Sequence, residues 1–160
     1  MAIVFILLGG NVGDKSKIFS KTKKLIGARI GLITKMSSVY TTESWGFESD
    51  LFWNQVIIVE SELDPLPILS QTQAIEREMG RIKKSAGYEA RIIDIDLLFY
   101  DDLELNTPDL TIPHPKIGER KFVLIPLNEL EPEKYHPVTG LKICEMLKLC
   151  QDPLRVDRID

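Results

Sequence analysis

Cysteine and histidine are scarce in this chain of 160 residues, which contains two of each. The cysteines, Cys144 and Cys150, lie six positions apart near the C-terminal end. A secreted disulfide scaffold needs more cysteines, and a structural zinc site needs further Cys or His ligands nearby. We therefore expect a reduced cytoplasmic protein that has neither a disulfide framework nor a zinc centre.

The chain also lacks a long hydrophobic run and an excess of positive charge. Its longest apolar stretch, Met1 to Leu8, is far shorter than the roughly 20 residues that cross a bilayer. The 20 Lys and Arg residues against 24 Asp and Glu residues give a net charge of −4, whereas a general nucleic-acid binder needs a broad basic face. We expect one domain over residues 1–160, with no membrane or nucleic-acid partner.

Hydrophobic patterns and turn residues predict the order of the elements. Apolar β-branched runs predict strands, and apolar positions at helical spacing between Asp or Pro starts and Gly ends predict helices. The proline-rich C-terminal third is expected to be irregular, apart from a short hairpin arm at 103–106 and a short helix at 143–150. The other predicted elements are strand 3–8, helix 14–27, strands 33–42 and 52–62, helix 64–80 and strand 92–100.

This β-α-β-β-α-β order predicts an α+β fold, the ferredoxin-like sandwich, followed by an irregular C-terminal extension. In that fold an antiparallel sheet carries both helices on one face. The opposite face of the sheet is then left for a site. A fold alone names no function, so the function has to come from particular residues.

Asp94-Ile95-Asp96 is the most informative triplet. On a strand, residues two apart point to the same face, so the two carboxylates would lie side by side. Mg²⁺ bound between them would relieve their repulsion, and paired magnesium ions suit phosphoryl transfer. A solvated strand face that carries two acids is the other interpretation of the pair.

The segment before this triplet concentrates positive charge in an acidic protein. Arg81, Lys83, Lys84 and Arg91 lie within twelve residues of glycine-containing sequence, from Gly80 onward. Cations next to paired carboxylates are what a polyphosphate with its magnesium ions requires. We expect this segment to be flexible and to close over bound phosphates, although a solvated charged loop has the same composition.

Three further features bear on ligand binding. The glycines after the first strand lack the spacing of a P-loop or a dinucleotide fingerprint, so they predict only a tight turn. His114 lies between two prolines, where a phosphate contact is one possible role. Aromatic residues around 45–53 precede Asn54, and rings with a side-chain amide can hold a flat heterocycle. Core packing is the alternative for these rings.

Together these segments resemble the 6-hydroxymethyl-7,8-dihydropterin pyrophosphokinases. The resemblance extends from the first strand to about Leu130. The Arg-x-x-Asp-x-Asp core, combined with the segments that follow it, is highly specific. The matching motifs are Leu8-Gly9-Gly10-Asn11, Ser38-x-Tyr40-x-Thr42, Phe52-x-Asn54, Ile75-Glu76-x-x-x-Gly80-Arg81, Arg91-Ile92-Ile93-Asp94-Ile95-Asp96-Leu97-Leu98, Pro113-His114-Pro115 and Glu119-Arg120-Lys121-Phe122-Val123-Leu124-x-Pro126-Leu127.

The resemblance implies transfer of a pyrophosphoryl group from ATP to the hydroxymethyl oxygen of the dihydropterin, with release of AMP, in folate biosynthesis. It also implies two Mg²⁺ and a small monomeric enzyme whose partners are small molecules. Position by position, it implies catalytic Arg81 and Arg91, metal ligands Asp94 and Asp96, ATP contacts Gln73, Glu76, Lys83, Leu97, Thr111, His114 and Arg120, and pterin contacts Thr42, Glu43, Ser44, Trp45, Phe52, Asn54 and Phe122.

The chain departs from the family pattern at several of these places. Glu89-Ala90 replaces a usual Gly-Pro, Ser44 replaces a frequent proline, Asp109 stands where arginine can occur, and Lys83 replaces another arginine. These changes bear on nucleotide affinity and loop closure more than on the reaction. From the sequence, two other functions stay open, a non-catalytic ligand-binding module of the same fold and a kinase that transfers only the γ-phosphoryl group.

Overall fold

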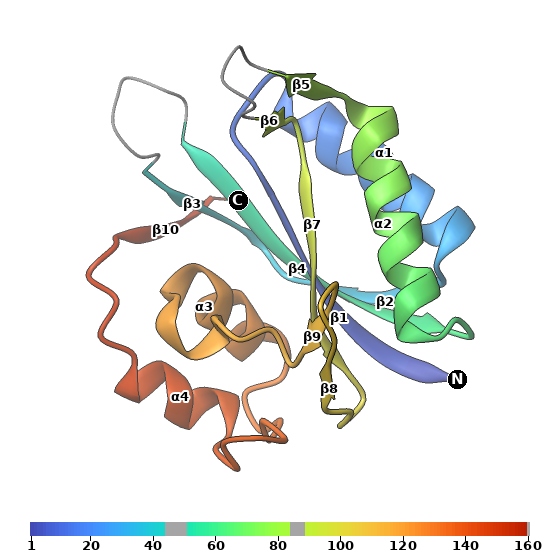
Figure 1. Cartoon of the computed structure of the whole chain (residues 1–160). Helices are drawn as coiled ribbons and strands as arrows, with labels where there is room; N and C mark the ends of the chain where they lie inside the picture. The colour runs from blue at the N-terminus through green and yellow to red at the C-terminus, as the bar shows by residue number, and fades with distance from the viewer. Residues whose placement is uncertain (44–50, 84–88, 160) are drawn as a thin grey trace.

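An antiparallel sheet runs through the molecule between two groups of helices (Figure 1). The computed structural model describes residues 1–43, 51–83 and 89–159. In chain order the elements are β1 (Ala2–Gly10), α1 (Lys15–Arg29), β2 (Leu32–Met36), β3 (Val39–Thr42), β4 (Phe52–Ser61), α2 (Pro65–Met79), β5 (Arg81–Lys83), β6 (Glu89–Arg91), β7 (Asp94–Tyr100), β8 (Leu105–Asn106), β9 (Thr111–Ile112), a 3-10 turn (Ile117–Glu119), α3 (Lys121–Leu130), α4 (Ile143–Leu149) and β10 (Val156–Ile159).

The sheet has the strand order β10-β3-β4-β1-β7, and β2 pairs with β4 next to β3. Every pairing in it is antiparallel. Helices α1 and α2 lie on one face, whereas α3 and α4 lie on the other (Figure 1). The predicted α+β sandwich with an antiparallel sheet is therefore confirmed, but the second face is partly covered by the C-terminal helices.

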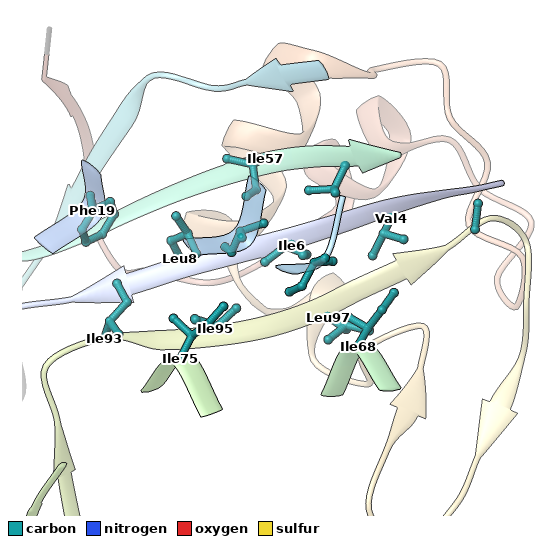
Figure 2. Close-up of a cluster of buried hydrophobic side chains, with 14 of the residues drawn as sticks. Val4, Ile6, Leu8, Phe19, Ile57, Ile68, Ile75, Ile93, Ile95 and Leu97 are labelled. Atoms are coloured by element: carbon teal, nitrogen blue, oxygen red, sulfur yellow. The ribbon is translucent and has the colours of Figure 1, made fainter. Parts of the chain in front are cut away.

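Alternating side chains of the central strands form two hydrophobic cores, one on each face of the sheet. On β1, Ile6 and Leu8 face α1 and α2, whereas Phe5 and Leu7 face the C-terminal helices. Ile57 of β4 belongs to the first core (Figure 2). Burial of each fully enclosed aliphatic side chain contributes about 1.5–3 kcal/mol, so the two cores hold the sheet from both sides.

Both predicted helix starts are present. Asp14 precedes α1, and its side chain accepts a hydrogen bond from the Lys17 N–H, which supplies a partner for one of the unpaired amides of the first turn. Asp64 precedes α2, with Pro65 as the first helical residue. At the other end, Gly80 has a φ of +115°, which a residue with a side chain rarely adopts.

Two predicted boundaries are wrong for identifiable reasons. Helix α1 does not end at Gly27 but runs to Arg29, because Ile26 and Ile30 are both buried and continue the apolar face. The predicted strand 33–42 is two strands, β2 and β3. Ser37 breaks it by accepting a hydrogen bond from the Val56 N–H through its hydroxyl oxygen, which competes with regular strand pairing.

The C-terminal part is more regular than expected. The short helix at 143–150 is confirmed as α4, but α3 and β10 were not predicted. Pro126 lies inside α3, and an internal proline normally signals the end of a helix. The arm at 103–106 was expected to form a hairpin, but β8 pairs with β9 and not with β7. Among the described residues, no helix is long and apolar enough to span a bilayer.

The close approach of Gly10 to the β6–β7 connection gives a first prediction. A Cβ on Gly10 would lie 2.6 Å from the carbonyl oxygen of Ile92, whereas one on Gly9 would meet nothing closer than 3.8 Å. Gly10→Ala should therefore lower the free energy of unfolding by about 1–3 kcal/mol, because backbone has to move. Urea denaturation measures this, with Gly9→Ala as the matched control; equal effects of the two variants would contradict the prediction.

Candidate active site

The pairing of three strands brings the predicted polar residues to one place. Gly9 of β1 lies opposite Asn54 of β4 on one side and opposite Asp94 of β7 on the other. Leu7 lies opposite Asp96. Because side chains alternate along a strand, both aspartates point away from the α1 and α2 core, to the face that α3 partly covers. The sequence prediction that Asp94 and Asp96 share a face agrees with this register.

A pocket of about 330 Å³, here called the sheet-face pocket, opens over these residues. It lies between the sheet, the start of α3 and the segment that leads to β10. Among the described residues, eight that were predicted as site residues meet here, together with three that were not predicted, Leu7, Gly9 and Leu154. The predicted ones are Thr42, Glu43, Phe52, Asn54, Asp94, Asp96, Arg120 and Phe122.

Hydrogen bonds fix the side chain of Asn54 in this pocket. Its Nδ2 donates to the main-chain oxygen of Tyr40 and to Oγ1 of Thr42, each at 3.3 Å. The side chain is only 4 % exposed. With Nδ2 engaged by β3, Oδ1 is the amide atom left to accept a hydrogen bond from a ligand.

The start of α3 forms the pocket wall opposite the sheet. The Arg120 guanidinium lies 5.6 Å from the centre of the Phe122 ring, within the range of a cation–π contact. Arg120 was predicted as an ATP contact, and the structure places it in the sheet-face pocket with both aspartates. The wall therefore offers a ring face and a positive charge close together.

A second pocket of about 300 Å³, here called the edge pocket, adjoins the first along β7. Of the residues that the structure describes, four predicted ones line it, Asp96, Leu97, Thr111 and His114. Asp96 lines both pockets, because β7 is the outer strand of the sheet and side chains from both of its faces reach the edge. The other lining residues are Leu69, Ile95, Pro108, Asp109, Leu110 and Pro115.

A hydrogen bond from the backbone defines the tautomer of the neutral His114 ring. Its Nδ1 accepts from the Lys116 N–H at 3.1 Å, which leaves Nε2 as the protonated donor nitrogen. Burial lowers the pKa of His114, and the Arg120 and Lys116 charges lower it further, while the Asp96 carboxylate acts in the opposite direction. A neutral imidazole with a donor N–H is suited to a phosphate or ribose oxygen.

Glu76 supports the aspartate pair from beneath the sheet. This α2 residue is 4 % exposed, and its Oε2 accepts a hydrogen bond of 2.9 Å from the Ile95 N–H. Ile95 lies between the two aspartates, so the bond holds the backbone that carries both of them. The predicted contact between Glu76 and ATP stays a prediction, since Glu76 lines neither pocket.

The remaining predicted site residues belong to α2, to the β5–β6 pair or to segments outside the described residues. Gln73 is exposed on α2. Arg81 and Arg91 are directly opposite each other where β5 pairs with β6, and Lys83 ends β5. The basic segment, expected to be flexible throughout, thus has paired strands at both ends, and residues 84–88 lie outside the described residues. So do Ser44 and Trp45.

Two adjoining pockets that share an acidic side chain suit a group-transfer enzyme, because ligands in the two pockets would meet at that side chain. Within residues 1–43, 51–83 and 89–159, no cluster of three or more His, Cys, Asp or Glu side chains could hold a metal ion. A metal in this site would therefore need oxygen ligands from a substrate or from water besides the two aspartates.

Comparison with known proteins agrees with this class. The sequence profile of the 7,8-dihydro-6-hydroxymethylpterin-pyrophosphokinase family matches residues 5–132. The chain is 44 % identical over 136 residues to a 2-amino-4-hydroxy-6-hydroxymethyldihydropteridine pyrophosphokinase of Porphyromonas gingivalis, covering 82 % of this chain and 92 % of the relative. It is 39 % identical over 140 residues to the Aquifex aeolicus enzyme of the same name, covering 86 % of each.

The chain belongs to the 7,8-dihydro-6-hydroxymethylpterin-pyrophosphokinase family. It is an enzyme of folate biosynthesis, a diphosphotransferase that uses ATP to transfer a pyrophosphoryl group to hydroxymethyldihydropterin. The predicted family and activity are confirmed, and a non-catalytic binding module is not favoured.

Solved structures support the fold. An HPPK-DHPS chain of Plasmodium falciparum, with pteroate, matches with a TM-score of 0.75 and 18 % identity over 92 % of this chain. The match covers 42 % of that chain, so the present chain spans less than half of its length. At this level of identity the likeness concerns the fold alone, and the fold is the predicted ferredoxin-like one.

The buried bond of Glu76 gives a second prediction. Glu76→Ala leaves the Ile95 N–H without this acceptor and should lower the free energy of unfolding by about 1–3 kcal/mol. Glu76→Gln retains a carbonyl oxygen at the same position and should lose less. Denaturant titration of both variants, with the exposed Gln73→Ala as a control, checks this. Equal losses for Ala and Gln at position 76 would contradict the role of the acceptor oxygen.

The histidine gives a third prediction, on pH dependence. Because the pKa of His114 in the folded state lies below its ordinary value of 6.5, the unfolded chain binds the proton more readily. Stability should be complete above about pH 6.5 and fall as the pH drops below it. His114→Asn keeps an acceptor for the Lys116 N–H but does not titrate.

The free energy of unfolding of His114→Asn should therefore fall less steeply between about pH 7 and pH 5 than that of the wild type. Burial also lowers the pKa of His136, so part of the dependence should remain. Urea denaturation at a series of pH values measures both slopes. If the free energy of unfolding depends on pH with the same slope in both proteins, His114 does not contribute to the pH dependence of stability.

Proposed function

We propose that the sheet-face pocket binds the dihydropterin, that the edge pocket binds ATP, and that Asp94 and Asp96 hold magnesium where the pockets meet. The observation that carries this proposal is the position of Asp96, which lines both pockets. A pyrophosphoryl group passes directly between the two substrates, so the acceptor hydroxyl and the β-phosphorus have to come together at one point. Asp96 marks that point.

The sheet-face pocket has the chemistry that a pterin needs. Phe52 and Phe122 are half-buried rings on the sheet and on α3, and a flat heterocycle between two ring faces gains offset stacking. Oδ1 of Asn54 accepts a hydrogen bond from an N–H of the heterocycle edge. Thr42 and Glu43, and Ser44 and Trp45 after them, complete the predicted pterin contacts.

The edge pocket fits a nucleotide base and ribose. Leu69, Leu97 and Leu110 supply apolar walls, while Thr111 and His114 supply hydroxyl and N–H donors. The triphosphate then extends toward Asp96 and the Arg120 charge. Lys83, Gln73 and Glu76 remain predicted ATP contacts, and Asp109 adds a negative charge at the rim of the pocket.

The donor set of the aspartate pair suits Mg²⁺. Two carboxylates supply hard oxygen ligands, but too few to enclose an ion without other ligands. Mg²⁺ characteristically binds one or two carboxylates together with substrate phosphates and water. When bound, two such ions neutralise charge on the phosphate chain and polarise the acceptor hydroxyl.

The side chains of this enzyme position the substrates and balance charge. Stacking and the Asn54 bond direct the hydroxymethyl oxygen toward the β-phosphorus. A bond forms between that oxygen and the β-phosphorus, and the bond from the β-phosphorus to the oxygen bridging to the α-phosphate breaks. AMP leaves with that oxygen, and the hydroxyl proton passes to water. Arg81 and Arg91, as predicted, would stabilise the charge that develops on the phosphates.

We also propose that residues 1–160 form a single domain that works as a cytoplasmic monomer, with small molecules as its partners and no nucleic acid. The net charge of −4 supports the last point.

The position of Asp96 gives a fourth prediction. Asp96→Asn should lower kcat by at least about a hundredfold and raise the magnesium concentration required, because it removes a charged ligand of the metal. Asp102→Asn, in the exposed turn after β7, is the matched control and should retain activity. The assay incubates enzyme, ATP, Mg²⁺ and the reduced pterin and separates the nucleotides. AMP is the expected product.

Three outcomes would count against parts of this proposal. Production of ADP would indicate γ-phosphoryl transfer in place of pyrophosphoryl transfer. An Asp96→Asn variant with full activity and an unchanged magnesium requirement would reject the metal assignment. Loss of activity in Asp102→Asn as large as that in Asp96→Asn would show that the effect is not specific to the site.

A further inference from the structure

The segment after α4 reaches the sheet-face pocket, although it lies beyond residues 5–132, where the family profile matches. Leu154 lies in this segment, is half-buried and lines the pocket together with Phe122 and Thr42. The chain then continues as β10 along the outer edge of the sheet (Figure 1). A segment outside the family match thus contributes a side chain to the pocket proposed for the pterin.

Asp152 connects this segment to the start of α3. Its Oδ2 accepts a hydrogen bond of 3.1 Å from the Lys121 N–H, and its Oδ1 accepts one of 3.0 Å from the Leu154 N–H. Lys121 is the first residue of α3, and the preceding Arg120 makes no side-chain cap. A carboxylate at this end also interacts favourably with the helix dipole. One side chain therefore fixes Leu154 relative to the helix that carries Phe122.

Strand β10 connects the same segment to the opposite wall. It pairs with β3 from Val156 opposite Thr42 to Ile159 opposite Val39. Oγ1 of Thr41 also donates a hydrogen bond to the main-chain oxygen of Asp157. Residues 152–159, here called the C-terminal clasp, thus join β3 to the start of α3. Leu154 lies between these two attachments and lines the pocket.

We infer that the C-terminal clasp is part of the pterin site, with Leu154 as a specificity-determining residue and Asp152 as a positioning residue. The inference rests on the proposed assignment of the pterin to the sheet-face pocket. Leu154 adds an uncharged surface to a pocket that also holds the carboxylates of Glu43, Asp94 and Asp96 and the Arg120 guanidinium. Next to Leu154 the pocket favours a flat uncharged heterocycle over a phosphate group. Asp152 keeps Phe122 and Leu154 at a fixed separation.

Leu154→Ala tests the specificity role by direct binding. Fluorescence titration with 6-hydroxymethylpterin should show affinity weakened by roughly fivefold to twentyfold, because apolar contact area with the ring is lost. Calorimetric titration with a non-hydrolysable ATP analogue and Mg²⁺ should give an affinity within about twofold of the wild type. Leu149→Ala, an equal truncation on the exposed face of α4, is the matched control and should leave both affinities unchanged.

Asp152→Ala and Asp152→Asn test the positioning role. Asp152→Ala removes both acceptor oxygens and should raise the pterin KM by roughly threefold to tenfold, with a smaller change in kcat. Asp152→Asn keeps one acceptor oxygen and should recover part of this loss. If the role of Asp152 is purely structural, Asp152→Ala should lower thermal stability and change the KM for pterin and the KM for ATP by similar factors. Should Asp152→Ala not fold, Leu154→Ala and its control decide the inference.

Phe122→Ala separates this inference from the assignment on which it rests. If Phe122→Ala weakens pterin binding while Leu154→Ala does not, the clasp inference is overturned and the pocket assignment stands. If Phe122→Ala leaves pterin binding unchanged, the pocket assignment itself is wrong. Weaker pterin binding in both variants, with nucleotide binding retained, supports the clasp as part of the site.

Discussion

Antiparallel pairing of β1 with β4 on one side and β7 on the other is the constraint on which the site depends. It places Gly9 between Asn54 and Asp94, so that an amide and a carboxylate flank a position without a side chain. A larger residue at this position would fill the floor of the pocket. The same pairing sends Ile95 and Leu97 into the core beneath, and this burial holds the polar side chains of β7 on the other face.

The site occupies the part of the second sheet face that its core does not cover. Val123, Leu124 and Leu127 of α3 pack onto the sheet, whereas Arg120 and Phe122 at its start overhang the pocket. The substrate face is therefore bounded by a helix that is itself anchored in a hydrophobic core. Anchoring of this helix holds one wall of the pocket in place, which reduces the ordering cost of binding.

Local patterns predicted the fold and the chemistry, but not the parts that depend on distant contacts. Strand periodicity alone predicted that Asp94 and Asp96 share a face, and the combined motifs indicated the family. Helix α3 was missed because Pro126 and a continuous apolar run hide helical spacing. Leu154 and Asp152 carry no local signal, since their roles arise from pairing with β3 and with the α3 start. The sequence indicates strand core for Leu7 and a turn for Gly9, and only the register of the paired strands places them in a pocket.

Helix α3 is held by hydrogen bonds near its end, with Ser38 and Tyr40, and at its start, with the C-terminal clasp. The Glu129 carboxylate accepts hydrogen bonds from the Ser38 N–H and from the Tyr40 hydroxyl, the latter at 2.6 Å, and Asp152 binds the first amide of the helix. A helix fastened at both extremities cannot swing outward as a hinged cover. Any adjustment of this wall to an entering flat molecule is then left to side chains such as the Phe122 ring, and rotation of a side chain is far faster than displacement of a helix.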